Sequence, residues 1–371
     1  MNTYLSYQLI ARDIPKALDR IEKQPVVDRE TKYYEENIGK VTSIDEFVQN
    51  DRLFKYAMKA AGLGDMDYAK AFMAKALKEG ISDPESFANK LTDKRYAQFV
   101  RSFNFAAHGA QTTVYNKAQQ ETVNNYAVQA AIDDTDPATV KAETDYYLTK
   151  IGSVKSIDDL LADDRLYAYA MKAYALDPAE DGRDLMRSVL EGGIRDPKSL
   201  ANTMDDKRFA AFAGAFNFEE LGENATTYSA SQQPVVANYM RQTLEEDAGQ
   251  TNQGVRLALY FQRKAPTLTN WYEVLADKAL ANVVRTAFGL PDSFASADID
   301  KQVQLFEDRF DIKDFADPEK LGTFLTRFTS LYEINNPTSS TVTSVSVLFS
   351  QPTTVGVSTD LMMAMQQLKP V

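Results

Sequence analysis

The chain has 371 residues, no cysteine and a formal net charge of −12, with 44% hydrophobic and 25% charged residues. This composition is typical of a folded protein of two or three domains and excludes low-complexity disorder for most of the chain. The absence of cysteine excludes disulfides, thiolate metal sites and a cysteine nucleophile. The acidic charge argues against nucleic acid as a partner, because binding to phosphates requires Lys and Arg.

Residues 4–22 carry apolar side chains at the spacing of an amphipathic helix, which Pro15 should kink or restart. The amino terminus lacks the basic and long apolar regions of a Sec signal peptide. No apolar run reaches the roughly 18 residues that a membrane-spanning helix needs. We therefore expect no insertion into a membrane.

A long internal repeat organises the next part of the chain. Segment 30–60 recurs as segment 143–173, at a constant offset of 113 residues (143 − 30). The register holds as far as Phe103-Asn-Phe105 and Phe216-Asn-Phe218. A period of this length, with this many identities, indicates a duplicated structural unit.

Every element of the repeat has a helical pattern. The first copy predicts a helix over 27–38, a second opened by a capping box at Ser43 and running to Ala60, a third over 66–79, a fourth begun by Asp83-Pro84, and a last one starting near Thr92. A connector helix over about 118–131 leads into the second copy.

A diverged third copy follows the second. Tyr260 takes the place of Tyr33 and Tyr146, and Asn270 takes the place of the cap Ser43. Trp271 stands where the clear copies have isoleucine, so we expect it in the core or at a helix start.

The sequence therefore predicts an all-α protein with two clear and one diverged tandem helical repeat unit of about 113 residues. A short irregular or extended tail, rich in Ser, Thr and Val, ends in a short apolar helix. The expected segments are an N-terminal helix (1–26), unit 1 with its connector (27–139), unit 2 with its connector (140–252), the diverged unit 3 (253–335) and the tail (336–371).

No group of residues forms a recognisable active site. P-loop, dinucleotide-binding and nucleophile-elbow patterns are absent, and the acidic stretches 133–136 and 177–182 lack the full spacing of a calcium loop. His108 is the only histidine, and its place in a linker predicts a solvated side chain. The repeated charges, such as Asp51-Arg52 and Asp93-Lys-Arg95, are interpreted as helix caps and ion pairs. We predict no catalytic, cofactor-binding or metal-binding residues, no cofactor and no enzymatic activity.

Repeated helical units more often build an extended binding surface than a catalytic cleft. Tyr33 and Tyr146 are candidates for such a surface because they occupy matching positions. Leu361, Met362 and Met365 are candidates because the expected terminal helix has five large apolar side chains in the eight residues 361–368. The chain's own N-terminal helix and a partner protein are the two alternatives for covering these methionines.

Two motifs of the repeat resemble a known family. They are Tyr-Tyr…Ile-Gly…Ser-Ile-Asp…Asp-Arg-Leu…Tyr-Ala-Met-Lys-Ala and the later Asp-Lys-Arg…Phe-Asn-Phe. They resemble an uncharacterised bacterial domain of unknown function whose genes lie among flagellar genes in alphaproteobacteria. The resemblance covers about residues 27–218 and implies association with the flagellum, without catalytic residues to carry over. Export of flagellar proteins in an unfolded state, without a Sec signal, is compatible with the cysteine-free, acidic chain.

The first hypothesis is a non-enzymatic structural or protein-interaction protein of the bacterial flagellum, acting in assembly, export or motility with a flagellar or export component as partner. It would be cytoplasmic or exported by the flagellar apparatus. The alternative is a cytoplasmic helical-repeat adaptor or chaperone that binds an exported protein in a groove between units. A third hypothesis, a hydrolase that uses a pair of carboxylates, requires two such groups to converge in one deep pocket.

Overall fold

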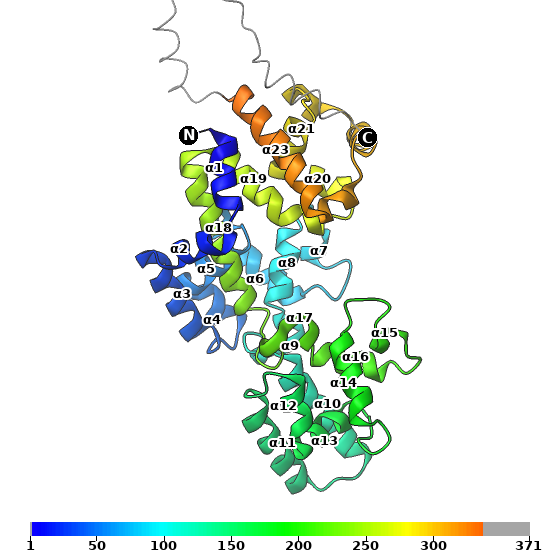
Figure 1. The fold of residues 1–371 in the computed structure, drawn as a ribbon. Helices are drawn as coiled ribbons and strands as arrows, with labels where there is room; N and C mark the ends of the chain where they lie inside the picture. Colours follow the sequence, from blue (N-terminus) through cyan, green and yellow to red (C-terminus); the bar gives the residue numbers. More distant parts are fainter. Residues whose placement is uncertain (1, 337–371) are drawn as a thin grey trace, which may run out of the picture. The chain divides into compact units, whose positions relative to one another are not determined.

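The computed structural model describes residues 2–336, and every regular element in this range is a helix (Figure 1). The expected all-α class is confirmed. The chain forms two compact units. The central unit runs from Arg29 to Tyr239, and the terminal unit combines the residues up to Asp28 with those from Met240 onward. The central unit therefore holds most of the two clear copies, and the terminal unit holds the diverged copy together with the N-terminal helices.

The two clear copies have the same order of helices. The first copy contains α3 (Pro25–Ile38), α4 (Ile44–Gln49), α5 (Asp51–Ala60), α6 (Lys70–Glu79), α7 (Phe87–Lys90), α8 (Arg95–Ser102) and α9 (Phe105–His108). The second contains α11 (Pro137–Ile151), α12 (Ile157–Ala162), α13 (Asp164–Ala173), α14 (Arg183–Gly192), α15 (Leu200–Thr203), α16 (Arg208–Ala215) and α17 (Phe218–Leu221). The connectors are α10 (Thr122–Ile132), which follows one π-helical turn at Lys117–Glu121, and α18 (Gln233–Thr251).

The predicted single helix from Ser43 to Ala60 was wrong, because the chain forms α4 and α5 there. Asn50 separates them with an extended backbone (φ −78°, ψ 93°), and its side-chain oxygen accepts a hydrogen bond from the Leu53 amide at 3.2 Å. Asp163 does the same between α12 and α13. A capping residue therefore interrupts what the apolar spacing alone predicts as one helix.

The predicted helix start at Asp83-Pro84 was also wrong. Asp83 accepts a hydrogen bond from the Glu85 amide at 2.8 Å, but the short helix α7 begins only at Phe87. The Asn89 side chain donates to the carbonyls of Ile81 and Asp83, so the Asp-Pro pair lies in a hydrogen-bonded turn.

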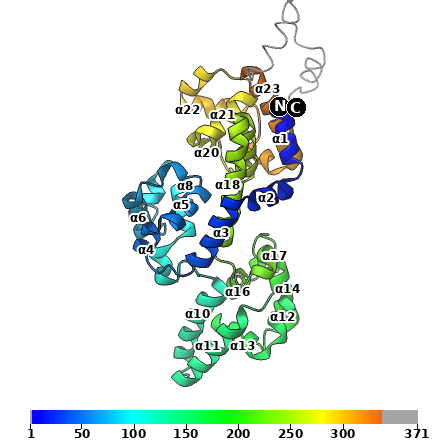
Figure 2. The same cartoon turned by 90° about the vertical axis from the view of Figure 1, so that its left-hand side faces the viewer.

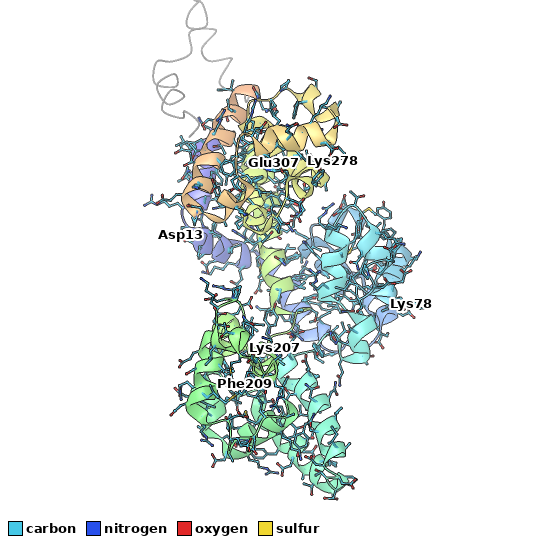
Figure 3. All side chains as sticks on the ribbon, turned by 90° about the vertical axis from the view of Figure 1, so that its right-hand side faces the viewer. Asp13, Lys78, Lys207, Phe209, Lys278 and Glu307 are labelled. Carbon is cyan, nitrogen blue, oxygen red and sulfur yellow. The ribbon has the colours of Figure 1, made fainter. Side chains whose placement is uncertain are left out.

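The side chains of the central unit fill the space between its helices, while charged side chains point outward (Figure 3). Phe209 of α16 is buried, whereas Lys78 and Lys207 are exposed. The last helix of the repeat was predicted correctly: Tyr96 and Phe99 on one face of α8 are buried.

The two clear copies are joined reciprocally through their buried tyrosines. The hydroxyl of Tyr34 in the first copy donates to the carbonyl oxygen of Ser231, just before the second connector. The hydroxyl of Tyr147 in the second copy donates to the carbonyl oxygen of Ala118, just before the first connector. Both partners of one bond lie 113 residues from their counterparts (147 − 34 and 231 − 118), so each copy binds the connector of the other.

Ring stacking repeats this exchange. Tyr56 of the first copy stacks on Tyr239 of α18, and Tyr169 of the second copy stacks on Tyr126 of α10, with 3.8 Å between ring centres in both pairs. All four rings are buried. Stacking of these buried rings stabilises each connector on the opposite copy.

The loops that lead into the connectors are hydrogen-bonded to one another. The side-chain amide of Asn116 donates to the backbone carbonyl of Tyr228 at 2.8 Å. The side-chain amide of Gln232 donates to the backbone carbonyl of Thr113 at 2.7 Å. The Ser231 hydroxyl also donates to Thr113. Burial removes these backbone carbonyls from water, and the side-chain donors replace the hydrogen bonds that water would make.

The terminal unit begins with two N-terminal helices, as Pro15 predicted. Asp13 caps the second helix by accepting from the Lys16 amide, and Pro15 lies in its first turn. The first helix packs on α19 and α23 (Figures 1 and 2). The helices are α1 (Thr3–Ala11), α2 (Ile14–Glu22), α19 (Gln253–Lys264), α20 (Trp271–Ala276), α21 (Lys278–Ala287), α22 (Ile299–Glu307) and α23 (Pro318–Asn335), together with the C-terminal part of α18.

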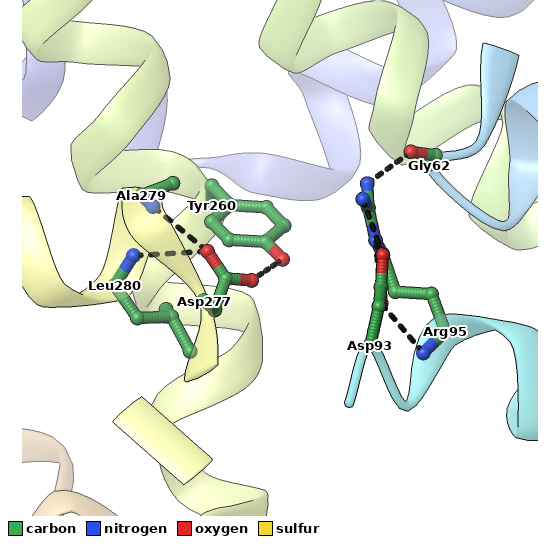
Figure 4. A network of polar contacts seen from close by, with 7 residues as sticks. All are labelled: Gly62, Asp93, Arg95, Tyr260, Asp277, Ala279 and Leu280. Carbon is green, nitrogen blue, oxygen red and sulfur yellow. Dashed lines mark hydrogen bonds and ion pairs between the residues drawn. The ribbon is translucent and has the colours of Figure 1, made fainter. Parts of the chain in front are cut away.

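The diverged third copy keeps two features of the clear copies. Tyr260 donates its hydroxyl to Asp277, which caps α21 by accepting from the amides of Ala279 and Leu280 (Figure 4, left). Trp271 starts α20 and is only 2% exposed, so the expectation of a core residue at a helix start is confirmed.

Candidate interaction surface

Tyr33 and Tyr146, the predicted interaction residues, are half-buried at equivalent places in the two copies. The Asn50 amide donates to the Tyr33 hydroxyl at 3.2 Å, and the Tyr146 hydroxyl donates to the Asp163 carboxylate at 2.7 Å. Asn50 and Asp163 are the caps of α5 and α13. Each tyrosine therefore stabilises a helix start within its own copy.

An arginine covers the face of each of these rings. The guanidinium carbon lies 3.6 Å from the ring centre for Arg52 over Tyr33, and 4.1 Å for Arg165 over Tyr146. Arg52 also donates to the Glu30 carboxylate at 2.9 Å, and this hydrogen bond lowers the pKa of Glu30. Because arginine already occupies one face of each ring, these contacts give the tyrosines a structural role.

The repeated Asp-Lys-Arg motif closes a turn in each copy. Arg95 pairs with Asp93 at 2.7 Å and donates to the carbonyl of Gly62, at the end of α5 (Figure 4, right). Arg208 makes the same contact with the carbonyl of Ala175. These contacts agree with the interpretation of the motif as ion pairing and capping.

An apolar groove, which we call the α10/α11 groove, is lined by residues of α10, of α11 and of the turn that joins them in the central unit. It has a volume of about 390 Å³. Three larger apolar side chains of the same helices are exposed: Val128 (58%), Ile132 (70%) and Leu148 (46%). The residues that line the groove are Ala127, Ala130, Ala131, Thr135, Pro137, Val140, Lys141, Thr144 and Asp145.

The equivalent face of the other connector is closed. Ala127 and Ala131 correspond, 113 residues on, to Met240 and Leu244 of α18, which are 8% and 6% exposed. Val140 of α11 corresponds to Val27 of α3, which is 3% exposed. The same helix face is thus buried under other parts of the chain at one connector and open at the other.

The chemistry of the groove is that of a binding surface. Its only carboxylate, Asp145, is paired with Lys141. A smaller pocket of about 130 Å³ in the terminal unit, between Tyr7 and Phe315, has no carboxylate in its lining. Within the described range 2–336, no three His, Asp or Glu side chains are grouped so that they could hold a metal ion. Mostly apolar walls with few polar groups favour an apolar ligand.

The expectation of a solvated loop position for His108 was wrong. His108 ends α9 and is half-buried, and its ring stacks on Tyr115 with 3.6 Å between ring centres. Burial lowers the pKa of His108, with Glu121 acting in the opposite direction. The Tyr115 hydroxyl donates to Glu121 at 3.0 Å, so the histidine belongs to a local structural cluster.

The other predicted interaction residues, Leu361, Met362 and Met365, lie outside the described residues. The α10/α11 groove was missed from the sequence, although a signal for it exists. The first connector has alanine at positions 127 and 131, where the second has methionine at 240 and leucine at 244. The first connector therefore lacks side-chain volume that the second has.

Comparison with known proteins places this architecture in a family. The model described as "Protein of unknown function (DUF1217)" matches residues 60–182 and again residues 173–321. The chain belongs to the DUF1217 family. The two DUF1217 matches start 113 residues apart (173 − 60), which is the period of the repeat.

A crystal structure of a structural-genomics protein from Agrobacterium tumefaciens is similar to this DUF1217 chain, with 37% sequence identity and a TM-score of 0.55. The similarity covers 90% of this chain and 94% of that one. No curated protein matches the sequence. Among the helices of residues 2–336, none combines the length and apolar character needed to span a membrane.

Proposed function

We propose that the chain is a non-enzymatic structural or protein-interaction protein of the bacterial flagellum, acting in assembly, export or motility. The α10/α11 groove is the observation that carries the interaction role, because it leaves apolar surface open at a place that the other connector buries. The flagellar assignment rests on the gene neighbourhood that the family resemblance implies.

The chemistry of the chain supports a protein partner, namely a flagellar or export component. A net charge of −12 disfavours nucleic acid and favours a partner with a basic surface around an apolar contact. The absence of cysteine also suits a chain that is unfolded for export, since no thiol can be oxidised on the way.

The test is a gene deletion in the source bacterium, complemented with the wild-type gene or with a groove variant. Ala127→Glu with Ala131→Glu places two charges on exposed positions of α10 that line the groove, so the fold should tolerate them. Lys78→Glu, an exposed substitution on α6, is the matched control. We expect the deletion and the groove variant to lose swimming on soft agar, while the control restores it. Normal swimming and flagellation of the deletion strain would reject the proposal.

A second candidate is a cytoplasmic adaptor or chaperone that holds an exported protein in the same groove. The groove favours it because its apolar walls would accept an amphipathic helix. Immunoblots of cytosol, sheared filaments and medium, in wild type and in a flagellar-export mutant, separate the two candidates. Export-dependent protein in the filament or medium supports an axial or secreted component, and protein confined to the cytosol supports the adaptor.

A further inference from the structure

We propose that the pocket between Tyr7 and Phe315 in the terminal unit binds a small neutral molecule with an apolar body and one carboxamide or hydroxyl group. All residues that line this pocket belong to the terminal unit. None of them lines the α10/α11 groove, so the inference does not depend on the proposed function.

The walls of the pocket are mostly apolar. They come from α1, α19, α23 and the two 3₁₀ turns Ala265–Thr267 and Ile312–Ala316. Apart from Tyr7 and Gln262, every residue of the lining is apolar, and the larger side chains are those of Phe315, Leu321 and Leu325. The volume is about 130 Å³. Since an apolar cavity of about 150 Å³ binds benzene, this pocket accommodates a body the size of one six-membered ring.

The two polar side chains of the lining lack hydrogen-bond partners. Tyr7 is 3% exposed, and no described residue forms a hydrogen bond with its hydroxyl. Burial raises the pKa of Tyr7 to about 12, so the hydroxyl keeps its proton at neutral pH and can donate it. The side-chain oxygen Oε1 of Gln262 is buried and accepts no hydrogen bond from any residue of the range 2–336.

These two groups define the chemistry of the ligand. An unpaired buried donor or acceptor destabilises the folded protein, because it has lost its contact with water. A ligand group that accepts from Tyr7 and donates to Gln262 removes both losses at once. A carboxamide or a hydroxyl group has this double capacity, whereas a carboxylate accepts only and an ammonium donates only.

Gly322 of α23 leaves the pocket open. Glycine inside a helix is less stable than alanine, and crowding does not explain it here, because a Cβ at this position would meet no atom within 4 Å. The clear copies have Ala97 and Ala210 at the equivalent positions, counted from the phenylalanine two residues on. The terminal unit therefore lacks side-chain volume in the wall of its pocket.

Benzamide is the probe, because its ring matches the pocket and its amide both accepts and donates. Trp271, the only tryptophan of the chain, reports binding by its fluorescence, since its ring centre lies 5.7 Å from that of Phe315. We expect saturable binding with a Kd of about 1 mM or tighter. No saturation up to about 10 mM would mean that water alone meets the two polar groups, and would overturn the proposal.

Benzonitrile is the matched control probe, because it has the same ring and accepts a hydrogen bond but cannot donate one. It should bind at least about fivefold more weakly than benzamide, since it leaves Gln262 unpaired. Gln262→Leu should abolish this preference, and Tyr7→Phe should weaken both probes by a similar factor, at least about threefold. A merely structural role would not change the ratio of the two affinities. Equal affinities in the wild type, or an unchanged ratio in Gln262→Leu, would overturn the proposal.

Gly322→Leu tests the location of the site. The new side chain takes up space in the wall of the pocket and should weaken benzamide binding at least about tenfold. Gly152→Leu in the central unit is the matched control, because a Cβ there also meets no atom within 4 Å, and its affinity should equal that of the wild type. Thermal unfolding checks that both variants fold. Unchanged binding by a folded Gly322→Leu variant would place the site elsewhere and overturn the proposal.

Discussion

The hydroxyl of Tyr34 donates a 2.6 Å hydrogen bond to the carbonyl oxygen of Ser231, 197 residues away along the chain. Tyr147 and Ala118 form the equivalent bond in the opposite direction. Each bond joins one copy of the repeat to the connector of the other, so the two copies stabilise each other and do not form independent folding units. Removing one such bond should therefore affect the whole central unit.

Tyr34→Phe and Tyr147→Phe should each destabilise the protein by about 1–2 kcal/mol, because each leaves a buried carbonyl oxygen without its partner. The two effects should be similar, since the sites are equivalent. Urea unfolding followed by circular dichroism measures them. Tyr68→Phe is the control: Tyr68 is 75% exposed, and its loss should change stability by less than about 0.5 kcal/mol. Losses as small as the control's in both buried variants would mean that the bonds contribute little.

Much of this architecture could be predicted from the sequence, and the reciprocal pairing could not. The 17-residue spacing of Tyr33 and Asn50 recurs at Tyr260 and Asp277, so the equivalence of the third copy is visible in the chain itself. Apolar periodicity, however, is local. It tells which face of a helix is buried but not which copy covers it, so the contact of Tyr34 with the other copy's connector has no sequence signal.

The buried tyrosines predict that the protein loses stability in alkali. Burial raises the pKa of Tyr169 and Tyr174 to about 12, and it also raises the pKa of Tyr34 and Tyr147 well above the ordinary value. In the unfolded chain tyrosine loses its proton near pH 10, while the folded protein keeps these protons. The unfolded state therefore binds fewer protons above pH 10, and the free energy of unfolding falls as the pH rises from 10 towards 12.

Each such tyrosine should contribute a slope of roughly 1 kcal/mol per pH unit near pH 11. Urea unfolding at half-unit steps from pH 9 to 11.5 measures the total slope. Tyr169→Phe removes one titrating group, so its slope should be smaller by that amount, whatever its stability at neutral pH. A slope unchanged by this substitution would contradict the role assigned to the buried hydroxyl.

Substitution of a buried ion pair in the terminal unit should lower the free energy of unfolding strongly. Glu245 accepts two hydrogen bonds from Arg263, at 2.7 and 2.8 Å, and the two side chains are 3% and 17% exposed. Glu245→Ala leaves a buried guanidinium without its partner and should cost about 3–5 kcal/mol. Thermal and urea unfolding measure the loss.

The exposed pair of Asp19 and Lys23 provides the control for this substitution. Its oxygen–nitrogen distance is also 2.7 Å, but its side chains are 52% and 72% exposed. Asp19→Ala should therefore cost less than about 1 kcal/mol. If Glu245→Leu together with Arg263→Met recovered no stability relative to Glu245→Ala, the uncompensated charge would not be the cause of the loss.

The turn after α5 in the first copy and the turn after α13 in the second copy have different residues at the same position. Gly62 after α5 has a φ of +71°, and its counterpart Ala175 after α13 has a φ of +55°. A side chain in this left-handed region costs roughly 1–2 kcal/mol, which glycine avoids. Ala175→Gly should therefore stabilise the protein by about 0.5–1 kcal/mol, part of the gain being offset by the greater freedom of glycine in the unfolded chain.

Gly62→Ala is the converse change and should destabilise the protein by about 1–2 kcal/mol. The carbonyls of both residues accept a hydrogen bond from an arginine, Arg95 and Arg208 respectively, so the backbone of each turn is held in the same way. Opposite signs for the two substitutions in urea unfolding would show that backbone strain differs between the copies. Destabilisation by both would mean that the Ala175 side chain contributes packing that outweighs its strain.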